Sequence, residues 1–124
     1  MMKPISVWKQ ELSGGAHAAR LAALYCCAPE QTPAQAARYE AVLDGLEATF
    51  GPHAEAGLYS APGRTEIGGN HTDHQHGRVL AGSVNIDMIA AAGPNTLGQL
   101  RVQSEGYDLC VIDLNDLAAR KEEE

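Results

Sequence analysis

The sequence predicts an α+β fold in which N-terminal helices are followed by a mostly antiparallel sheet. In the first half of the chain, apolar residues recur at helical spacing, whereas the period changes to two after Pro52. Short groups of turn residues separate the later segments, as is typical of neighbouring antiparallel strands. With 124 residues, the chain has the length of one compact domain and is too short for two independent ones.

The first predicted helix lies in residues 14–27, which are rich in alanine. Ala18, Leu21, Ala22 and Tyr25 recur at the spacing of one helix face. We expect this helix to end before the proline at position 29.

The second predicted helix has clear start and stop signals. Thr32 is expected to be the N-cap, Pro33 the first helical residue and Gln35 the capping-box partner. Gly51 and Pro52 are expected to end the helix. Its apolar face is predicted to consist of Tyr39, Val42, Leu43, Leu46 and Phe50.

Strands are predicted at residues 56–63, 83–92, 99–104 and 109–114. The second of these alternates Val84, Ile86, Met88 and Ala90 against Asn85, Asp87 and Ile89, which predicts a half-buried strand with the first set inward. In the third, Leu100 is expected to point inward together with Val102. Residues 93–95 and the pair at 105 and 106 are expected to be turns.

Charge and cysteine content restrict the class of partner and the compartment. A net charge of −7 and a pI near 5.1 exclude a basic surface for nucleic acid or an anionic membrane. A small neutral or cationic ligand fits better. The cysteines are odd in number, and Cys26 and Cys27 are adjacent, which predicts a reducing, cytoplasmic setting. The sequence contains no apolar run long enough for a signal peptide or a membrane span.

One polar stretch, "APGRTEIGGNHTDHQHGRVL" at residues 61–80, is the candidate functional segment. It is too polar for a core and too rich in glycine for a helix. Its ionisable or planar hydrogen-bonding side chains are Arg64, Glu66, Asn70, His71, Asp73, His74, His76 and Arg78. Three kinds of ligand are considered for them: a phosphate, a metal or a sugar.

A phosphate site made by this stretch alone is disfavoured. Gly63 and Gly68 have the outer spacing of a P-loop, but Gly69 and Asn70 stand where the lysine and the serine or threonine should be.

A metal site requires the histidines to converge. On an extended segment, His74 and His76 point to one face, whereas His71 and Asp73 point to the other, so four ligands would meet only at a sharp bend. A solvated loop is the simpler interpretation of His74 and His76.

A sugar or other polyol is the third kind of ligand, and the alternation that separates the histidines favours it. His71 and Asp73 share a face, where a carboxylate accepts from neighbouring hydroxyls and an imidazole donates or accepts. Asn70 adds a donor and an acceptor. Arg64 has the fork of donors that neutralises a transferring phosphoryl group or fixes a carboxylate base.

The stretch "APGRTEIGGNHTDHQHGRVLAGSVNID" resembles the galactokinase signature, whose usual form begins A-P-G-R-V-N-L-I-G-E-H-T-D-Y. That family belongs to the GHMP small-molecule kinases, and the resemblance covers about residues 35–115. The positions that agree in register are Ala61, Pro62, Gly63, Arg64, Gly69, His71, Thr72, Asp73, Gly77, Val79 and Leu80.

The resemblance implies the N-terminal domain fold of a GHMP kinase and ATP-dependent phosphorylation of the anomeric hydroxyl of α-D-galactose. Arg64 resembles the arginine that stabilises the transition state and the catalytic aspartate. Asn70, His71, Thr72 and Asp73 occupy the part of the signature that binds the sugar hydroxyls. No metal ligand is implied among them.

The sequence departs from the usual signature at several positions. Asn70 replaces a glutamate that also contacts the sugar, which keeps hydrogen bonding but removes a charge. This change bears on the choice of sugar more than on the class of reaction. Other replacements include Glu66 for asparagine, Gly68 for isoleucine, His74 for tyrosine and Ala81 for proline.

The resemblance also implies a longer kinase. The family's Gly-Leu-Ser-Ser-Ser type phosphate loop and its proposed aspartate base lie downstream of the signature, and neither is found in this sequence. We therefore expect an N-terminal piece that is inactive alone, with ATP and Mg²⁺ held only by the full-length parent. Residues 1–55 are expected to be a helical lead-in, residues 56–114 to hold the strands with the signature loop at 61–80, and residues 115–124 to be a charged tail.

Two other classes of function remain as alternatives. One is a non-catalytic sugar-sensing or interaction module, and the other is a metal-dependent hydrolase that uses His71, His74 and His76. The expected partner is galactose or a closely related sugar. Self-association is expected if truncation exposes apolar surface and sheet edges.

Overall fold

The structure is a computed structural model that describes residues 1–52, 55–69 and 76–118. Its internal contacts divide the chain into two compact units, Met1–Gly93 and Pro94–Glu124, which are described one at a time. Length alone predicts a single domain. The boundary falls at the Gly93-Pro94 pair, where the predicted turn at 93–95 lies.

Helices form the first half of the larger unit. They are α1 (Ile5–Ser13), α2 (Ala18–Tyr25), the 3₁₀ turn η1 (Pro29–Gln31) and α3 (Thr32–Phe50). The sequence interpretation missed α1, although Ile5, Trp8 and Leu12 are its buried residues and recur at helical spacing.

The helix predicted within residues 14–27 is shorter than expected. It begins at Ala18, because the preceding Gly15 has a φ of +74°, a left-handed conformation that ends α1 and separates it from α2. Its C-cap is Cys26, which also has a positive φ, of +48°. The two glycines at 14 and 15 therefore belong to the connection between two helices.

The start of α3 differs from the predicted capping box. Gln31 occupies the N-cap position, and Thr32 is already helical, with its Oγ1 donating to the carbonyl of Pro29 at 2.8 Å. The side chain of Gln31 instead accepts from the backbone N–H of Ala28 at 3.0 Å. Because η1 runs directly into α3, the helix begins one residue earlier than predicted. The end is as predicted, with α3 stopping at Phe50 before Gly51.

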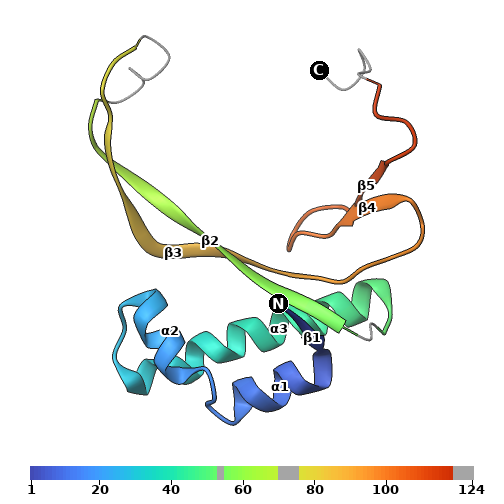
Figure 1. Cartoon of the computed structure of the whole chain (residues 1–124), viewed down its shortest axis with the longest axis horizontal. Coiled ribbons are helices and arrows are strands. Elements are labelled where there is room, and N and C mark those ends of the chain that lie inside the picture. The colour runs from blue at the N-terminus through green and yellow to red at the C-terminus, as the bar shows by residue number, and fades with distance from the viewer. Residues whose placement is uncertain (53–54, 70–75, 119–124) are drawn as a thin grey trace. The chain divides into compact units, whose positions relative to one another are not determined.

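The helices pack on one face of an antiparallel sheet, as Figure 1 shows for this unit. The indole Nε1 of Trp8 donates to the carbonyl of Ala56 at 2.8 Å and joins α1 to the sheet. Burial of each large apolar side chain here stabilises the fold by roughly 1.5–3 kcal/mol. The buried core consists of Ile5, Trp8, Leu12, Leu21, Tyr25, Ala36, Tyr39, Leu43, Leu46 and Ala56.

The sheet has the order β1-β2-β3, with β1 at Met2–Pro4, β2 at Glu55–Gly68 and β3 at Leu80–Ala92. Both pairings are antiparallel, which confirms the predicted α+β class. The β2–β3 register shifts twice, between Pro62 and Arg64 and between Glu66 and Gly68. Such irregularities bend a strand pair.

The covered face of β3 is the opposite of the predicted one. Ile89 and Ala91 pack against the helical core, whereas Ile86 and Met88 are 76% and 78% exposed. The period of two correctly predicts a strand, but it does not say which face a helix will cover. The covered face carries Asp87, whose charge has partners among the helices. Self-association through exposed apolar residues stays a prediction.

In the smaller unit, residues 94–118 are described and form a hairpin of β4 (Gln99–Val102) and β5 (Cys110–Asp113). The predicted turn at 105 and 106 lies between them, with a φ of +80° at Gly106. The prediction that Leu100 and Val102 point inward is wrong, since they are 49% and 44% exposed. Two strands alone do not bury a face of a hairpin.

Among the described helices, none combines the length and apolar character that a bilayer span requires. The three cysteines, Cys26, Cys27 and Cys110, are free thiols.

Candidate functional site

The described part of the candidate segment contributes to a two-stranded arm, which we define as residues 62–68 of β2 and 80–86 of β3. Figure 1 shows this ribbon leaving the helices. Most residues of the arm are exposed, because no helix packs over it along its length. The described part of the candidate segment on the arm is therefore largely exposed to solvent.

Arg64, the predicted catalytic residue, lies on β2 opposite Ser83. Its side chain is 72% exposed, and its Nη2 lies 3.3 Å from Oε1 of Glu66 on the same strand. An exposed pair of this kind is worth little energy, so the guanidinium can be drawn to another anion at low cost.

The predicted sugar ligands Asn70, His71, Thr72 and Asp73 lie outside the described residues. The proposed sharing of a face by His71 and Asp73 therefore stays a prediction.

The chain enters and leaves this segment at fixed places. Gly68 pairs with Leu80, and Gly69 has a φ of +85°. A Cβ atom on Gly69 would overlap the carbonyl oxygen of Arg78. The close approach of Gly69 to the backbone of Arg78 thus requires glycine, in agreement with the glycine at this position of the signature.

The phosphate-loop alternative has no support in the backbone. Gly63 and Gly68 both lie within β2, an extended strand, and not in a loop that leads into a helix N-terminus. Gly63 has a different use, because its Cβ position lies 3.2 Å from the carbonyl of Ile86 and from Cγ2 of Val84. It allows the strands to pack closely where the register shifts.

The metal alternative rests on residues that are mostly outside the described part. His71 and His74 are not described, whereas His76 is exposed with a φ of +59°. Across residues 1–52, 55–69 and 76–118, no group of three histidine, cysteine or carboxylate side chains is placed to hold a metal ion.

A buried polar cluster at the base of the arm was missed by the sequence interpretation. The side chain of Asp87 on β3 is only 2% exposed. Its carboxylate accepts from Nη2 of Arg38 at 2.8 Å, from the hydroxyl of Tyr25 at 2.6 Å and from Oγ of Ser60 at 2.5 Å. The hydroxyl of Tyr39 lies 2.8 Å from that of Tyr25. Because Tyr25 donates to Asp87, Tyr39 donates to Tyr25.

Two contacts extend this cluster. Arg38 donates through Nη1 to Oε1 of Gln35 at 2.7 Å, and its guanidinium carbon lies 5.5 Å from the centre of the Tyr25 ring. Asn85 donates through Nδ2 to the carbonyl of Tyr25 at 3.2 Å. A signal for the cluster existed in the sequence, since Asp87 sits among apolar residues of a strand.

These partners keep Asp87 ionised. Burial alone raises the pKa of its carboxyl group, but the hydrogen bonds from Ser60, Tyr25 and Arg38 outweigh burial and hold the pKa below its usual value. The pKa of Tyr25 is raised, first by burial and then by its bond to the Asp87 carboxylate. The Arg38 pKa is raised by the same carboxylate.

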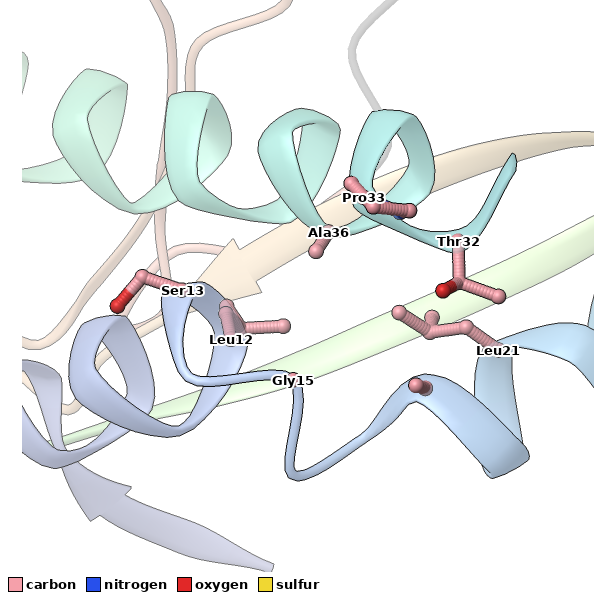
Figure 2. A pocket seen from close by; sticks show the side chains of 8 residues that line it. Leu12, Ser13, Gly15, Leu21, Thr32, Pro33 and Ala36 are labelled. Atoms are coloured by element: carbon pink, nitrogen blue, oxygen red, sulfur yellow. The ribbon is translucent and has the colours of Figure 1, made fainter. Parts of the chain in front are cut away.

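A small pocket lies among the helices (Figure 2). It has a volume of about 70 Å³, whereas ligand pockets usually measure about 300–1,000 Å³. It contains no ionisable side chain, so it is a packing hollow and not a sugar site. Its lining consists of Leu12, Ser13, Gly15, Ala18, Leu21, Thr32, Pro33 and Ala36.

Comparison with known proteins supplies the class. Residues 46–94 match the galactokinase galactose-binding signature, which confirms the resemblance seen in the sequence. The matched range runs from the end of α3 through β2 and β3 and includes Arg64, the polar segment and Asp87. The chain is thus an α+β protein that carries the sugar-binding signature of galactokinases. Searches of curated proteins and of solved structures returned no significant match.

Proposed function

We propose that this chain is the sugar-binding portion of an ATP-dependent galactokinase, an enzyme that phosphorylates the anomeric hydroxyl of α-D-galactose. The observation that carries the proposal is the match of residues 46–94 to the galactose-binding signature. Two features support it: an exposed arm that presents the polar segment, and an exposed arginine on that arm.

The proposed roles divide along the segment. Asn70, His71, Thr72 and Asp73 bind the sugar, because amide, imidazole, hydroxyl and carboxylate groups together match the donors and acceptors of neighbouring hydroxyls. Arg64 acts at the phosphoryl end, where a planar cation stabilises charge that develops on the transferred group.

The described residues of the arm do not form a cradle for the phosphates of ATP. A phosphate cradle needs backbone N–H groups at a helix N-terminus or a glycine-rich loop, whereas the glycines of the arm lie in and beside an extended strand. We propose that these 124 residues bind the sugar without turning it over. A reducing, cytoplasmic setting is proposed with it, in keeping with three free cysteines.

Two measurements on the whole chain test this proposal. Calorimetric titration should show galactose binding at one site, with weaker binding of glucose, its 4-epimer, because a site built for one hydroxyl pattern leaves groups unpaired with another. A coupled assay with galactose, ATP and Mg²⁺ should show no turnover. Absence of galactose binding would contradict the proposed sugar site, and measurable turnover would contradict the lack of activity.

The same preparation tests the alternative of a metal-dependent hydrolase. Stoichiometric zinc in the purified protein, measured by elemental analysis, would favour the metal-dependent hydrolase over the sugar site.

A further inference from the structure

Asp87 lies where the arm leaves the helices. It pairs with Pro62, the residue at which the β2–β3 register first shifts and the arm begins. Ser60, which donates to Asp87, lies on the neighbouring strand two pairs closer to the core. The carboxylate is thus at the junction between the helix-covered part of the sheet and the exposed arm.

This one side chain joins four elements. It accepts from Tyr25 at the end of α2, from Arg38 in α3 and from Ser60 in β2, and it belongs to β3 itself. Asn85, two residues before Asp87 on the same face of β3, also bonds to the helices by donating to the carbonyl of Tyr25. Both strands of the arm are therefore held to the helices at its base.

The chemistry of the junction favours a directional role. An apolar side chain would fill this position without the cost of burying a charge. A carboxylate with three donors at 2.5–2.8 Å holds its partners in one geometry, whereas apolar contacts tolerate sliding and rotation. The neighbouring covered residues, Ile89 and Ala91, are apolar and supply the packing.

We propose that Asp87 is a positioning residue that sets the direction in which the arm leaves the helices and thereby places Arg64. Arg64 is four residues from Ser60 along β2, a path of roughly 13 Å at ordinary strand rise. A small rotation of the arm at its base therefore displaces Arg64, and the displacement grows with this distance. A functional side chain must be held to within about 0.5 Å of its productive position, so even a small rotation matters. The claim that the arm direction affects galactose binding rests on the proposed function. The claim that Asp87 holds the arm in one direction does not.

Amide hydrogen exchange on the whole chain tests this inference. In Asp87→Asn, the acceleration of exchange at the arm amides should exceed that at the helical amides by at least about tenfold, because the helical amides respond only to the loss of global stability, whereas the arm amides also lose their attachment at the base. The emission of Trp8, the single tryptophan, should be unchanged and so reports an intact core. Equal acceleration in helices and arm would show a general stability role and overturn the inference, as would no change in the arm.

Matched variants make the result decisive. Asp108→Asn removes an exposed carboxylate of the smaller unit and should leave the arm unchanged. Ser60→Ala removes only the donor on β2 and should accelerate the arm by about threefold without affecting the helices. If Asp87→Asn does not fold, Ser60→Ala decides alone, since arm-selective acceleration supports the inference and uniform or absent acceleration overturns it.

Galactose titration of the same variants tests the functional step. Affinity should fall by about tenfold in Asp87→Asn and remain unchanged in Asp108→Asn, because the proposed sugar ligands Asn70 to Asp73 follow directly on the β2 strand of the arm, whereas Arg64 is proposed to act on the phosphoryl group and not on the sugar. If Asp87→Asn accelerates exchange in the arm but leaves the galactose affinity unchanged, the claim that the arm direction affects galactose binding is overturned. If the wild-type chain binds no galactose, the proposed function fails, and the exchange data still decide whether Asp87 positions the arm.

Discussion

The backbone of Gly69 lies against the carbonyl oxygen of Arg78, and no Cβ atom fits between the two backbone segments. Gly69 also has a φ of +85°, which L-residues rarely adopt. It follows directly on β2, at the pair that Gly68 forms with Leu80. This contact therefore closes the arm and fixes where the chain enters the segment that we propose binds galactose.

Gly69→Ala should weaken galactose binding strongly. The positive φ alone costs an alanine about 1–2 kcal/mol, and the overlap with Arg78 forces the strands apart. We expect at least about a tenfold loss of affinity in a calorimetric titration.

The adjacent glycine provides the control. Gly68→Ala places a methyl group where nothing lies within 4 Å, at an ordinary φ, so binding should stay within about twofold of wild type. Equal losses in both variants would show that the turn geometry at Gly69 is not the cause.

Arg64 and Asp73 should respond differently to truncation. Asp73→Ala should abolish measurable galactose binding, because the sugar loses a charged acceptor. Arg64→Ala should change the affinity by less than about threefold, since its proposed partner is the phosphoryl group and its side chain is 72% exposed. In the complete kinase, Arg64→Ala should lower kcat by about 10²–10³-fold, as removal of a transition-state donor does.

The comparison of the two variants is made by titration for affinity and by a coupled assay for kcat. A large loss of galactose affinity in Arg64→Ala with wild-type affinity in Asp73→Ala would reverse the proposed roles.

The sequence predicted the positions of strands and helices better than it predicted which face of strand β3 the helices cover. The alternation in residues 83–92 correctly indicates a strand, but Ile86 and Met88 are exposed and Asp87 faces the helices. Side-chain polarity alone favours the opposite arrangement. The choice depends on Tyr25 and Arg38, which are 62 and 49 residues away in sequence and become neighbours only in the fold.

Local signals were reliable where they were strongest. The end of α3 at Gly51 and the strand after it follow from glycine, proline and the change of period. The start of α3 was displaced by one residue, because η1 precedes it directly. At the candidate site, motif similarity predicts roles for Arg64 and Asn70–Asp73, whereas Asp87 has no motif and depends on tertiary contacts.

Leu43→Ala should destabilise the larger unit by about 2–5 kcal/mol. Leu43 is completely buried in the core between helices and sheet, so its truncation leaves a cavity. Urea unfolding followed by Trp8 fluorescence measures the change, because Trp8 belongs to the same cluster. Leu24→Ala, at a position that is 49% exposed, should cost less than half as much. Similar costs for the two leucines would contradict the assignment of the core.

Stability should depend on pH through Asp87. Burial raises the pKa of its carboxyl group, but the bonds from Ser60, Tyr25 and Arg38 outweigh burial, so the folded pKa is below the unfolded one. The unfolded chain therefore binds this proton first as the pH falls. The contribution of Asp87 is fully present above roughly pH 5 and is lost from about pH 4 downward, with a slope of at most about 1.4 kcal/mol per pH unit.

Urea unfolding of wild type and Asp87→Asn at pH 7, 5, 4 and 3 measures this effect. The difference in unfolding free energy between the two proteins should narrow toward low pH. The Asp108→Asn control should follow the wild type throughout. A difference that stays constant from pH 7 to pH 3 would show that Asp87 does not titrate below its usual range in the folded state.

Asn70→Glu should change the choice of sugar, because it restores the carboxylate usual at this position of the signature. A charged acceptor forms stronger bonds to hydroxyls than a neutral amide, and it donates none, so hydroxyls that must accept from Asn70 lose a partner. We expect the ratio of galactose to glucose affinity to change by at least about tenfold, in the range of a single hydrogen bond to a charged group. Parallel titrations with both sugars measure the ratio, and Asn70→Gln, which keeps the amide, is the matched control. An unchanged ratio in Asn70→Glu would mean that position 70 does not contact the hydroxyls that distinguish these sugars.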